Sequence, residues 1–225
     1  MIISASYKTD IPAFYGDWFM RRLRAGFCHM VNPYGRQIYT VRLDRDAVDG
    51  FVFWTRNCGP FMGALEEIKS LGHPFVVHVT ITGYPRVLDA ATIRPEIAVS
   101  HLREIAQAYG PRAGVWRYDP IVFSQLTPAG WHRENFARLA EALEGVVDEV
   151  VVSTVQPYRK TARNMARAAQ TGGFEWSDPA DAEKKALLGE LAEIAADHAM
   201  RLTLCGQPEL LGGGIGEASC IDAAR

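Results

Sequence analysis

The 225-residue sequence lacks the features that mark several large classes of protein. Its apolar runs reach only five to eight residues before a polar group interrupts them, too few for a transmembrane helix. The first residues, Met1-Ile2-Ile3-Ser4, lack the basic segment that begins a signal peptide. The net charge is −2 and no run of lysine or arginine indicates a nucleic-acid surface. We therefore expect a cytoplasmic protein whose partner is neither a membrane nor a nucleic acid.

Cysteine is scarce, which limits the roles that thiols can have. The four cysteines are Cys28, Cys58, Cys205 and Cys220, and no two of them form a Cys-x-x-Cys pair. This pattern indicates neither a disulfide framework nor a zinc ribbon. Cys205 and Cys220 are the candidates for two metal ligands of an incomplete cluster, although free thiols are the favoured interpretation.

Several catalytic signatures are also missing. There is no Gly-x-Ser-x-Gly elbow of a serine hydrolase, and the glycine run at 212–216 lacks the Gly-Lys-Ser/Thr of a P-loop. Residues 4–10 contain no glycine, which argues against a dinucleotide-binding fingerprint after the first strand. The six histidines show no His-x-His or His-Glu-x-x-His spacing, so a zinc hydrolase is disfavoured.

The sequence does contain a regular alternation of short apolar runs and amphipathic segments. Its composition, 48% hydrophobic and 22% charged, is typical of a globular protein with a sizeable core. Apolar runs predict strands at 1–7, 50–56, 75–83, 114–120, 148–156 and 200–205. Apolar residues at helical spacing predict helices at 10–26, 60–71, 94–109, 127–143 and 157–169, and another from 177 onward.

This alternation predicts an α/β fold with parallel strands and right-handed crossovers. Six strands fit a TIM-like partial (β/α)6 barrel better than the usual eightfold barrel. A hairpin signal, Asn32-Pro33-Tyr34-Gly35, predicts a β-hairpin excursion over 27–43. The length suits a single barrel domain over 1–225, either complete or truncated at its C-terminus.

The segment 114–120 (Gly-Val-Trp-Arg-Tyr-Asp-Pro) is the centre of this prediction. Strand alternation places Arg117 and Asp119 on one face and Trp116 and Tyr118 on the other, where they would pack under the helices. Ionisable groups in a run fit for burial are costly unless they are paired or functional. A proline that supplies no N–H should end the strand, and parallel folds place ligands at such ends. An Arg–Asp pair that only ties a loop to the rim is the alternative.

Each predicted strand becomes polar at its carboxyl end, and in a barrel these ends surround one mouth. The alternative is that strands end in polar groups because loops are solvated. We predict a small-molecule pocket lined by polar side chains from these ends. The residues are Ser6, Lys8, Asp10, Thr55, Arg56, Asn57, His78, Thr80, Thr82, Arg117, Asp119, Gln156 and Gln207.

Side-chain chemistry suggests individual roles within this set. The guanidinium groups of Arg56 and Arg117 can clamp a carboxylate or phosphate. Asp10 is predicted as a helix N-cap, with Lys8 beside the same anion-attracting turn. Lys8, Asp10 and Asp119 are the candidates for acid–base catalysis. His78 lies mid-strand, where a satisfied interior histidine is favoured over a metal ligand.

Five segments, 4–14, 53–57, 82–84, 116–120 and 220–222, carry recognisable short patterns in order. They include Phe-Trp-Thr-Arg-Asn at 53–57, Trp-Arg-Tyr-Asp-Pro at 116–120 and Cys-Ile-Asp at 220–222. Together they resemble a bacterial family catalogued as domain of unknown function 1848, over residue 2 to the end. The resemblance implies a body similar to the partial barrels of radical S-adenosylmethionine enzymes. It also implies a cysteine-rich tail, beyond this point, suited to an iron–sulfur cluster.

This sequence departs from the family pattern at three places. It stops five residues after Cys220, Lys8 stands where many members carry arginine, and Gly206 stands where alanine is commoner. If the native chain continues, the resemblance implies a [4Fe–4S] cluster and S-adenosylmethionine at the strand ends. If it ends at residue 225, Cys205 and Cys220 cannot supply three ligands, and cluster chemistry is unsupported.

Three functions stay open on the sequence. The leading hypothesis is a radical-SAM-like enzyme body, of unknown reaction, in which Arg117 and Asp119 orient a carboxylate or amine of a small ligand. The second is a cofactor-free barrel enzyme acting on a small anionic substrate such as a sugar phosphate. The third is a non-catalytic ligand-binding or scaffold domain. The sequence does not give the substrate, the reaction or the oligomeric state.

Overall fold

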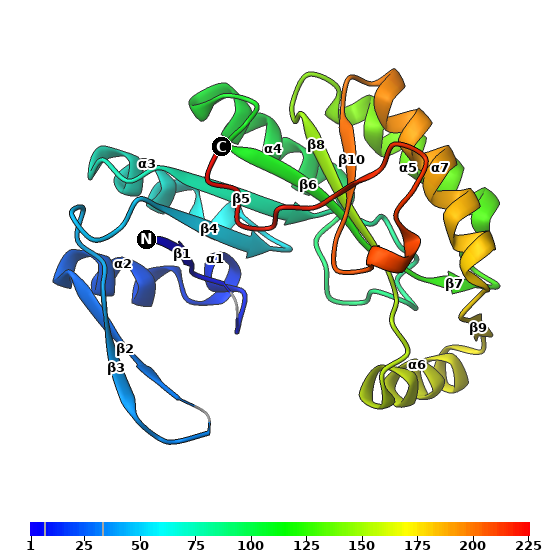
Figure 1. Cartoon of the computed structure of the whole chain (residues 1–225), viewed down its shortest axis with the longest axis horizontal. Helices are drawn as coiled ribbons and strands as arrows, with labels where there is room; N and C mark the ends of the chain where they lie inside the picture. The colour runs from blue at the N-terminus through cyan, green and yellow to red at the C-terminus, as the bar shows by residue number, and fades with distance from the viewer. Residues whose placement is uncertain (7, 33) are drawn as a thin grey trace. The chain divides into compact units, whose positions relative to one another are not determined.

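The computed structural model of the protein describes residues 1–6, 8–32 and 34–225. The chain forms two compact units (Figure 1). The first comprises Met1–His78 and the terminal segment Ile221–Arg225, and the second comprises Val79–Cys220. The fold is α/β, as the alternation of strand and helix patterns predicts. Each unit is described by itself below.

The first unit contains two strands of the main sheet and most of a third, which ends in the second unit. β1 (Ile2–Ser4) pairs in parallel with β4 (Gly50–Thr55), and β5 (Phe75–Thr80) is next in the order. Five of the six β4 residues are buried, as is typical of a parallel strand covered on both faces. The predicted first strand, 1–7, is thus shorter than expected, and its last residue, Tyr7, lies outside the described residues.

Four short helical segments complete the parallel part of this unit: α1 (Ile11–Phe14), α2 (Gly16–Ala25), the 3₁₀ helix η1 (Gly59–Phe61) and α3 (Met62–Ser70). α2 ends as predicted at Gly26, whose φ of 76° is left-handed and therefore favours glycine. The core between α2 and β4 is aromatic. The ring of Phe19 packs edge-on against Phe51 and Phe53, with centroid distances of 5.3 Å to each.

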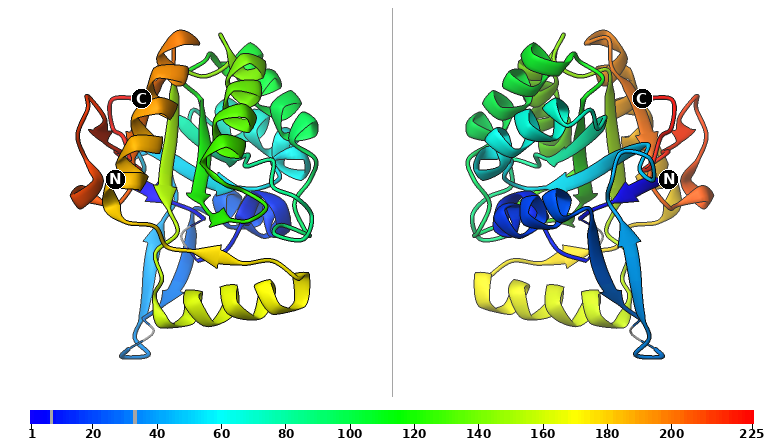
Figure 2. Two further views of the ribbon diagram at one scale, coloured as in Figure 1. Left: turned by 90° about the vertical axis from the view of Figure 1, so that its right-hand side faces the viewer. Right: turned by 90° about the vertical axis from the view of Figure 1, so that its left-hand side faces the viewer.

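The predicted hairpin excursion over 27–43 is confirmed. β2 (Phe27–Val31) and β3 (Ile38–Arg42) pair antiparallel, from Phe27 opposite Arg42 to Val31 opposite Ile38. Figure 2 shows the two strands as an arm that extends from the end of α2. Pro33, in the predicted turn, lies outside the described residues.

The second unit contains the other four strands of the sheet, β6 (Gly114–Ile121), β8 (Glu149–Thr154), β10 (Arg201–Leu204) and β11 (Gly216–Glu217), in that order. All three neighbouring pairs are parallel, which confirms the predicted strand direction. The register of β6 against β8 shifts between Tyr118 and Ile121, and Pro120 lies in this irregularity. A residue without an N–H is tolerated there because a bulge interrupts the ladder.

The second unit contains five helical elements, and the predicted apolar residues of its three longest helices are mostly buried. The five elements are α4 (Pro95–Tyr109), α5 (Ala129–Leu143), α6 (Arg159–Gly172), α7 (Asp181–Asp197) and the short 3₁₀ helix η2 (Pro208–Leu210). α5 and α7 lie side by side (Figures 1 and 2). Leu102, Phe136 and Leu191 are among the fully buried side chains. α6 buries none of its residues, and its N-terminal half is basic.

Two boundary predictions are wrong. The strand at 114–120 does not stop before Pro120 but continues as β6 to Ile121. The last helix does not open at Ser177-Asp178-Pro179; instead β9 (Trp176–Ser177) pairs antiparallel with β7 (Phe123–Ser124) and α7 begins at Asp181. The sequence could not reveal this two-residue pairing, because its partners are some fifty residues apart and too short to show a period.

The sequence patterns also predict Thr127 as a helix N-cap and Phe14, Trp18 and Ile97 on apolar helix faces, and the structure overturns these predictions. Thr127 is not a helix cap, because its Oγ1 donates instead to the carbonyl oxygen of Val122 at 2.7 Å. Phe14 and Trp18, at helical spacing with the buried Phe19, are 77% and 41% exposed. Ile97 of α4 is 38% exposed. Helical spacing indicates which residues share a face, whereas neighbouring elements decide how much of that face is covered.

Candidate functional site

Strand β6 presents different chemistry on its two faces. Trp116 and Tyr118 are completely buried. The Nε1 of Trp116 donates to the carbonyl oxygen of Ile81 at 2.9 Å, and its ring stacks on Phe136 of α5 with a centroid distance of 4.7 Å. This confirms the predicted alternation, with the aromatic residues under the helices. Arg117 therefore points to the opposite face of the strand.

Arg117 and Asp119 form a nearly buried, two-pronged ion pair. The Nε of Arg117 donates to both carboxylate oxygens of Asp119, at 3.2 and 3.1 Å, and Nη2 donates to Oδ2. The two side chains are only 10% and 16% exposed. Burial alone would lower the pKa of Arg117, but the charge of Asp119 and the hydrogen bonds to it raise that pKa. Arg117 is predicted from the sequence to bind the carboxylate or phosphate of a ligand. In the structure Asp119 already occupies one side of its guanidinium group.

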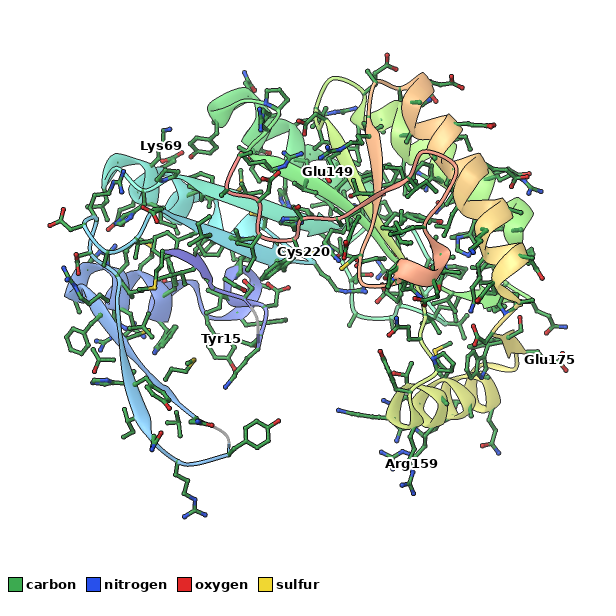
Figure 3. All side chains as sticks on the ribbon, viewed as in Figure 1. Tyr15, Lys69, Glu149, Arg159, Glu175 and Cys220 are labelled. Carbon is green, nitrogen blue, oxygen red and sulfur yellow. The ribbon has the colours of Figure 1, made fainter. Side chains whose placement is uncertain are left out.

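Two cysteines lie against this ion pair. Cys205 directly follows β10, and the loop at 212–214 turns the chain back so that β11 lies beside β10. Gly213 and Gly214 permit that turn, with left-handed φ angles of 61° and 84°. The Sγ atoms of Cys205 and Cys220 are 3.2 Å apart, and Nη1 of Arg117 donates to Sγ of Cys220 at 3.7 Å. Figure 3 shows Cys220 on the segment that follows β11.

The two thiols differ in acidity. The hydrogen bond from Cys220 lowers the pKa of Cys205 to about 6, because it and the charge of Arg117 outweigh the effect of burial. The same hydrogen bond, together with burial, raises the pKa of Cys220. These opposite shifts favour the negative charge on Cys205 rather than on Cys220. A thiolate is both a nucleophile and a ligand for soft metals.

A buried network of hydrogen bonds joins β6 to α5. The hydroxyl of Tyr118 donates to Nδ1 of His132 at 2.9 Å, and Asn135 donates to the same hydroxyl at 3.1 Å. Nε2 of His132 donates to the carbonyl oxygen of Val122 at 3.0 Å, so the proton of the neutral ring is on Nε2. Burial lowers the pKa of His132 to about 4 and raises that of Tyr118. The network holds α5 and β6 in one arrangement.

Gln156 and Gln207, predicted to line the pocket, tie together the loops after β8 and β10. The Oε1 of Gln207 accepts from the N–H of Thr154 at 2.6 Å, and its Nε2 donates to the Thr154 hydroxyl at 2.8 Å. Gln156 donates to the carbonyl oxygen of Gly206 at 3.3 Å. These amides hold the backbone that directly follows Cys205.

The predicted residues of the first unit include a helix cap. Asp10 accepts from the N–H of Ala13 at 3.0 Å, which confirms it as the N-cap of α1. Its second carboxylate oxygen accepts from the N–H of Arg56 at 2.9 Å, so the same side chain fastens the end of β4. Both oxygens of Asp10 are therefore engaged with backbone.

Thr55 and Asn57 stabilise the turn that follows β4. The N–H of Asn57 donates to the Thr55 hydroxyl at 2.9 Å, and the N–H of Gly59 donates to the Asn57 side chain at 3.1 Å. His78 is 3% exposed, and its ring lies 5.6 Å from that of Trp54, in keeping with an interior histidine.

Ser6 and Lys8 have different environments. Ser6 is 8% exposed, and among the described residues its hydroxyl has no hydrogen-bond partner. Lys8 is exposed and lines a cavity of the first unit with Ser4 and Thr9. Of the predicted site residues in the first unit, Asp10 is hydrogen-bonded to the backbone of Arg56, and Thr55 is hydrogen-bonded to the backbone of Asn57.

Thr80 and Thr82 line a small cavity of about 180 Å³ in the second unit. Arg86 and Arg94 line it too, and Arg94 immediately precedes α4. Neither arginine is among the site residues predicted from the sequence. One sequence pattern could have indicated Arg94. It directly precedes Pro95 at a predicted helix start, where backbone N–H groups also attract anions.

The described residues do not complete an iron–sulfur site. A [4Fe–4S] cluster is held by several cysteine thiolates, and Cys205 and Cys220 supply two. Over residues 1–6, 8–32 and 34–225, no group of three His, Cys, Asp or Glu side chains is placed to hold a metal. The two thiols match the donor chemistry of such a cluster but not its ligand number.

These features define an α/β protein with a pair of cysteines and an ion pair toward the carboxyl ends of parallel strands, where such folds bind ligands. The chain belongs to the family described as domain of unknown function DUF1848, whose family model matches residues 2–225. The resemblance seen in the sequence is thereby confirmed at the level of the family. No curated protein matches the chain. None of the helices in the described part of the chain is long and apolar enough to cross a membrane.

Proposed function

We propose that the chain is the body of a thiolate-dependent enzyme that binds a small molecule at the carboxyl ends of β6 and β10. The observation that carries this proposal is the Cys205–Cys220 pair, with sulfur atoms 3.2 Å apart beside the Arg117 guanidinium. Cys205 is half-buried rather than enclosed. Because Asp119 engages the guanidinium, the thiolate is the reactive group of the site and Arg117 stabilises its charge.

We also propose that the parallel strands adopt the partial (β/α)6 barrel of radical S-adenosylmethionine enzymes. The alternation of parallel strands and helices within each unit supports this, as does the position of the thiols at strand ends. In that setting Cys205 and Cys220 would hold part of an iron–sulfur cluster, whose other ligands the described residues do not supply. The bacterial origin and the cytoplasmic location stay predictions.

Anaerobic reconstitution tests the cofactor part of this proposal. The protein, with and without its native downstream sequence, is incubated with ferrous iron and sulfide, and bound iron is measured per chain. We expect a brown, iron-loaded protein in the longer form and a loss of iron in Cys205→Ala and Cys220→Ala. Cys28→Ala is the matched control, because Cys28 belongs to the hairpin of the first unit. A colourless longer form would remove the cluster from the proposal.

A second candidate is a cofactor-free enzyme, or a binding domain, for a small anion. The cavity lined by Thr80, Thr82, Arg86 and Arg94 favours it, because two hydroxyls and two arginines suit a phosphate or carboxylate. Thermal stabilisation by inorganic phosphate that disappears in Arg94→Gln would favour this candidate. A turnover assay would then separate an enzyme from a binding domain.

A further inference from the structure

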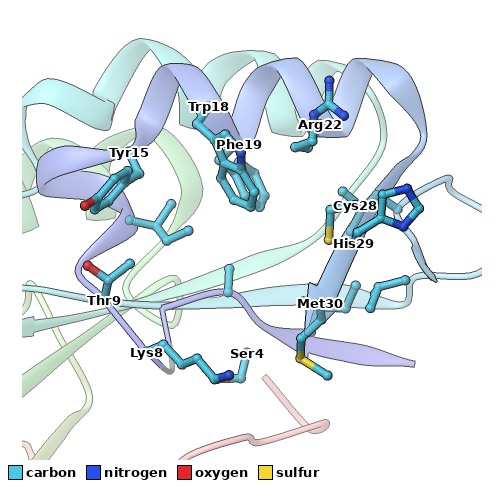
Figure 4. A pocket seen from close by; sticks show the side chains of 15 residues that line it. Ser4, Lys8, Thr9, Tyr15, Trp18, Phe19, Arg22, Cys28, His29 and Met30 are labelled. Atoms are coloured by element: carbon cyan, nitrogen blue, oxygen red, sulfur yellow. The ribbon is translucent and has the colours of Figure 1, made fainter. Parts of the chain in front are cut away.

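The first unit contains a second cavity that the proposed function does not use. It has a volume of about 450 Å³ and is bounded by β1, α2 and the β2–β3 hairpin (Figure 4). This volume falls within the range of small-molecule sites, roughly 300–1,000 Å³. The proposed thiolate site consists of residues of the second unit, whereas this cavity is lined by residues of the first.

The walls of this cavity are mainly apolar. Tyr15, Trp18 and Phe19 line it from the α2 side, and Met30 lines it from the hairpin (Figure 4). Trp18 and Met30 are 41% and 47% exposed, although side chains of this type are usually covered. An apolar body seated here would remove that surface from water.

The charged groups of the cavity are all positive. Lys8 and Arg22 line it, whereas no aspartate or glutamate does. Within the described part of the chain neither side chain has a carboxylate partner. Figure 4 shows Lys8 extending toward Ser4, whose hydroxyl is buried and has no hydrogen-bond partner among the described residues.

The positive charge of Arg22 acts on a thiol that lines the cavity. Burial raises the pKa of the Cys28 thiol, and the charge of Arg22 opposes that rise. Cys28 lines the same cavity from the hairpin. Arg22 is therefore close enough to the lining to attract an anion there.

We propose that this cavity binds a small amphipathic anion. Its aromatic or aliphatic body lies against Trp18, Phe19 and Met30. Its carboxylate, sulfonate or phosphate group is bound by Lys8, with the Ser4 hydroxyl as an additional donor and Arg22 at the edge. This site does not depend on the proposed function of the thiol pair.

Two fluorescent probes that share one aromatic body test this proposal. 8-Anilinonaphthalene-1-sulfonate carries the anionic group, and N-phenyl-1-naphthylamine lacks it. Titration of the folded protein with each probe gives a dissociation constant and a stoichiometry. We expect one saturable site for the sulfonate and weaker binding of the neutral probe.

Two variants then remove the positive charge of Lys8 and the empty volume of the cavity separately. In Lys8→Met, which keeps the aliphatic stem, we expect the dissociation constant of the sulfonate to rise about tenfold and that of the neutral probe to stay unchanged. Lys69→Met, an exposed lysine outside the cavity, is the matched control and should match wild type. Cys28→Phe, which fills the cavity, should abolish the binding of both probes while the far-ultraviolet circular dichroism is retained.

The proposal is overturned if the wild-type protein does not bind the sulfonate saturably. Equal affinity in Lys8→Met and Lys69→Met overturns it as well, as does an equal loss of both probes in Lys8→Met. Alanine variants of Cys205 and Cys220 should bind both probes normally, so this experiment can succeed or fail independently of the iron reconstitution.

Discussion

A single hydrogen bond between two sulfur atoms gives Cys205 and Cys220 different chemistry. This contact lowers the pKa of Cys205 and raises that of Cys220, so the negative charge is favoured on Cys205, where Arg117 stabilises it. Asp119 keeps Arg117 in place and compensates most of its charge. The remaining negative charge therefore lies on a sulfur atom at the end of a strand.

Alkylation by iodoacetamide as a function of pH tests this assignment. Because the pKa of Cys205 is lowered to about 6, its thiolate is present above that pH and is lost below it. We expect the alkylation rate of Cys205 to be half-maximal near pH 6 and constant above neutral pH. In Cys220→Ala, which lacks the donor, the midpoint should move up by at least one pH unit. Peptide mass spectrometry follows each cysteine separately.

The outcome is judged against Cys28 in the same sample. Burial raises the pKa of Cys28, so this thiol should react appreciably only in alkaline solution. Identical midpoints in wild type and Cys220→Ala would contradict the hydrogen bond from Cys220.

At the scale of elements, α5 holds the site-bearing strand β6 in place. The ring of Phe136 stacks on Trp116 and packs edge-on against Tyr118, at centroid distances of 4.7 and 5.1 Å. His132 and Asn135 of the same helix bond the Tyr118 hydroxyl. The position of Arg117 on the opposite face thus depends on how α5 packs.

Truncation of Phe136 should measure this packing. Phe136 is completely buried, so Phe136→Ala should lower the free energy of unfolding by about 3–5 kcal/mol, because it leaves a cavity against Trp116. Phe136→Leu should lower the free energy of unfolding by less than Phe136→Ala does. Urea unfolding followed by circular dichroism gives both values. Phe14→Ala, at a side chain that is 77% exposed, should change stability by about 0.5 kcal/mol or less.

At the scale of the whole molecule, stability should depend on pH through a buried neutral histidine. The pKa of His132 is lowered to about 4 because burial disfavours its charged form, whereas an unfolded histidine titrates near 6.5. Between these values the unfolded chain binds more protons than the folded chain. Stability is therefore constant above about pH 6.5 and falls as the pH drops toward 4.

We expect the free energy of unfolding at pH 5 to be about 2 kcal/mol lower than at pH 7 because of His132 alone. Burial also lowers the pKa of His73 and His101, which act with the same sign, so the comparison with His132→Gln isolates this residue. The variant should be less stable at pH 7 and lose part of the pH dependence. An unchanged slope between pH 7 and pH 5 in the variant would contradict the assignment.

The sequence by itself determined the α/β class, the parallel direction of the strands, the hairpin at 27–43, the Asp10 cap and the buried face of β6. Each of these depends on interactions within a few residues or on a simple apolar period, which a single chain displays directly. The Trp116 and Tyr118 alternation is the clearest case, because a strand must send consecutive side chains to opposite faces.

Only the tertiary structure decided which groups meet. In the tertiary structure Cys220 contacts Cys205 and Arg117, and the side chain of Gln207 accepts a hydrogen bond from the backbone of Thr154. Trp18 is exposed at a cavity that Lys8 also lines. These contacts join segments separated by up to a hundred residues, and their geometry follows from strand order and loop path. No local period records that information, because it arises when distant segments pack together.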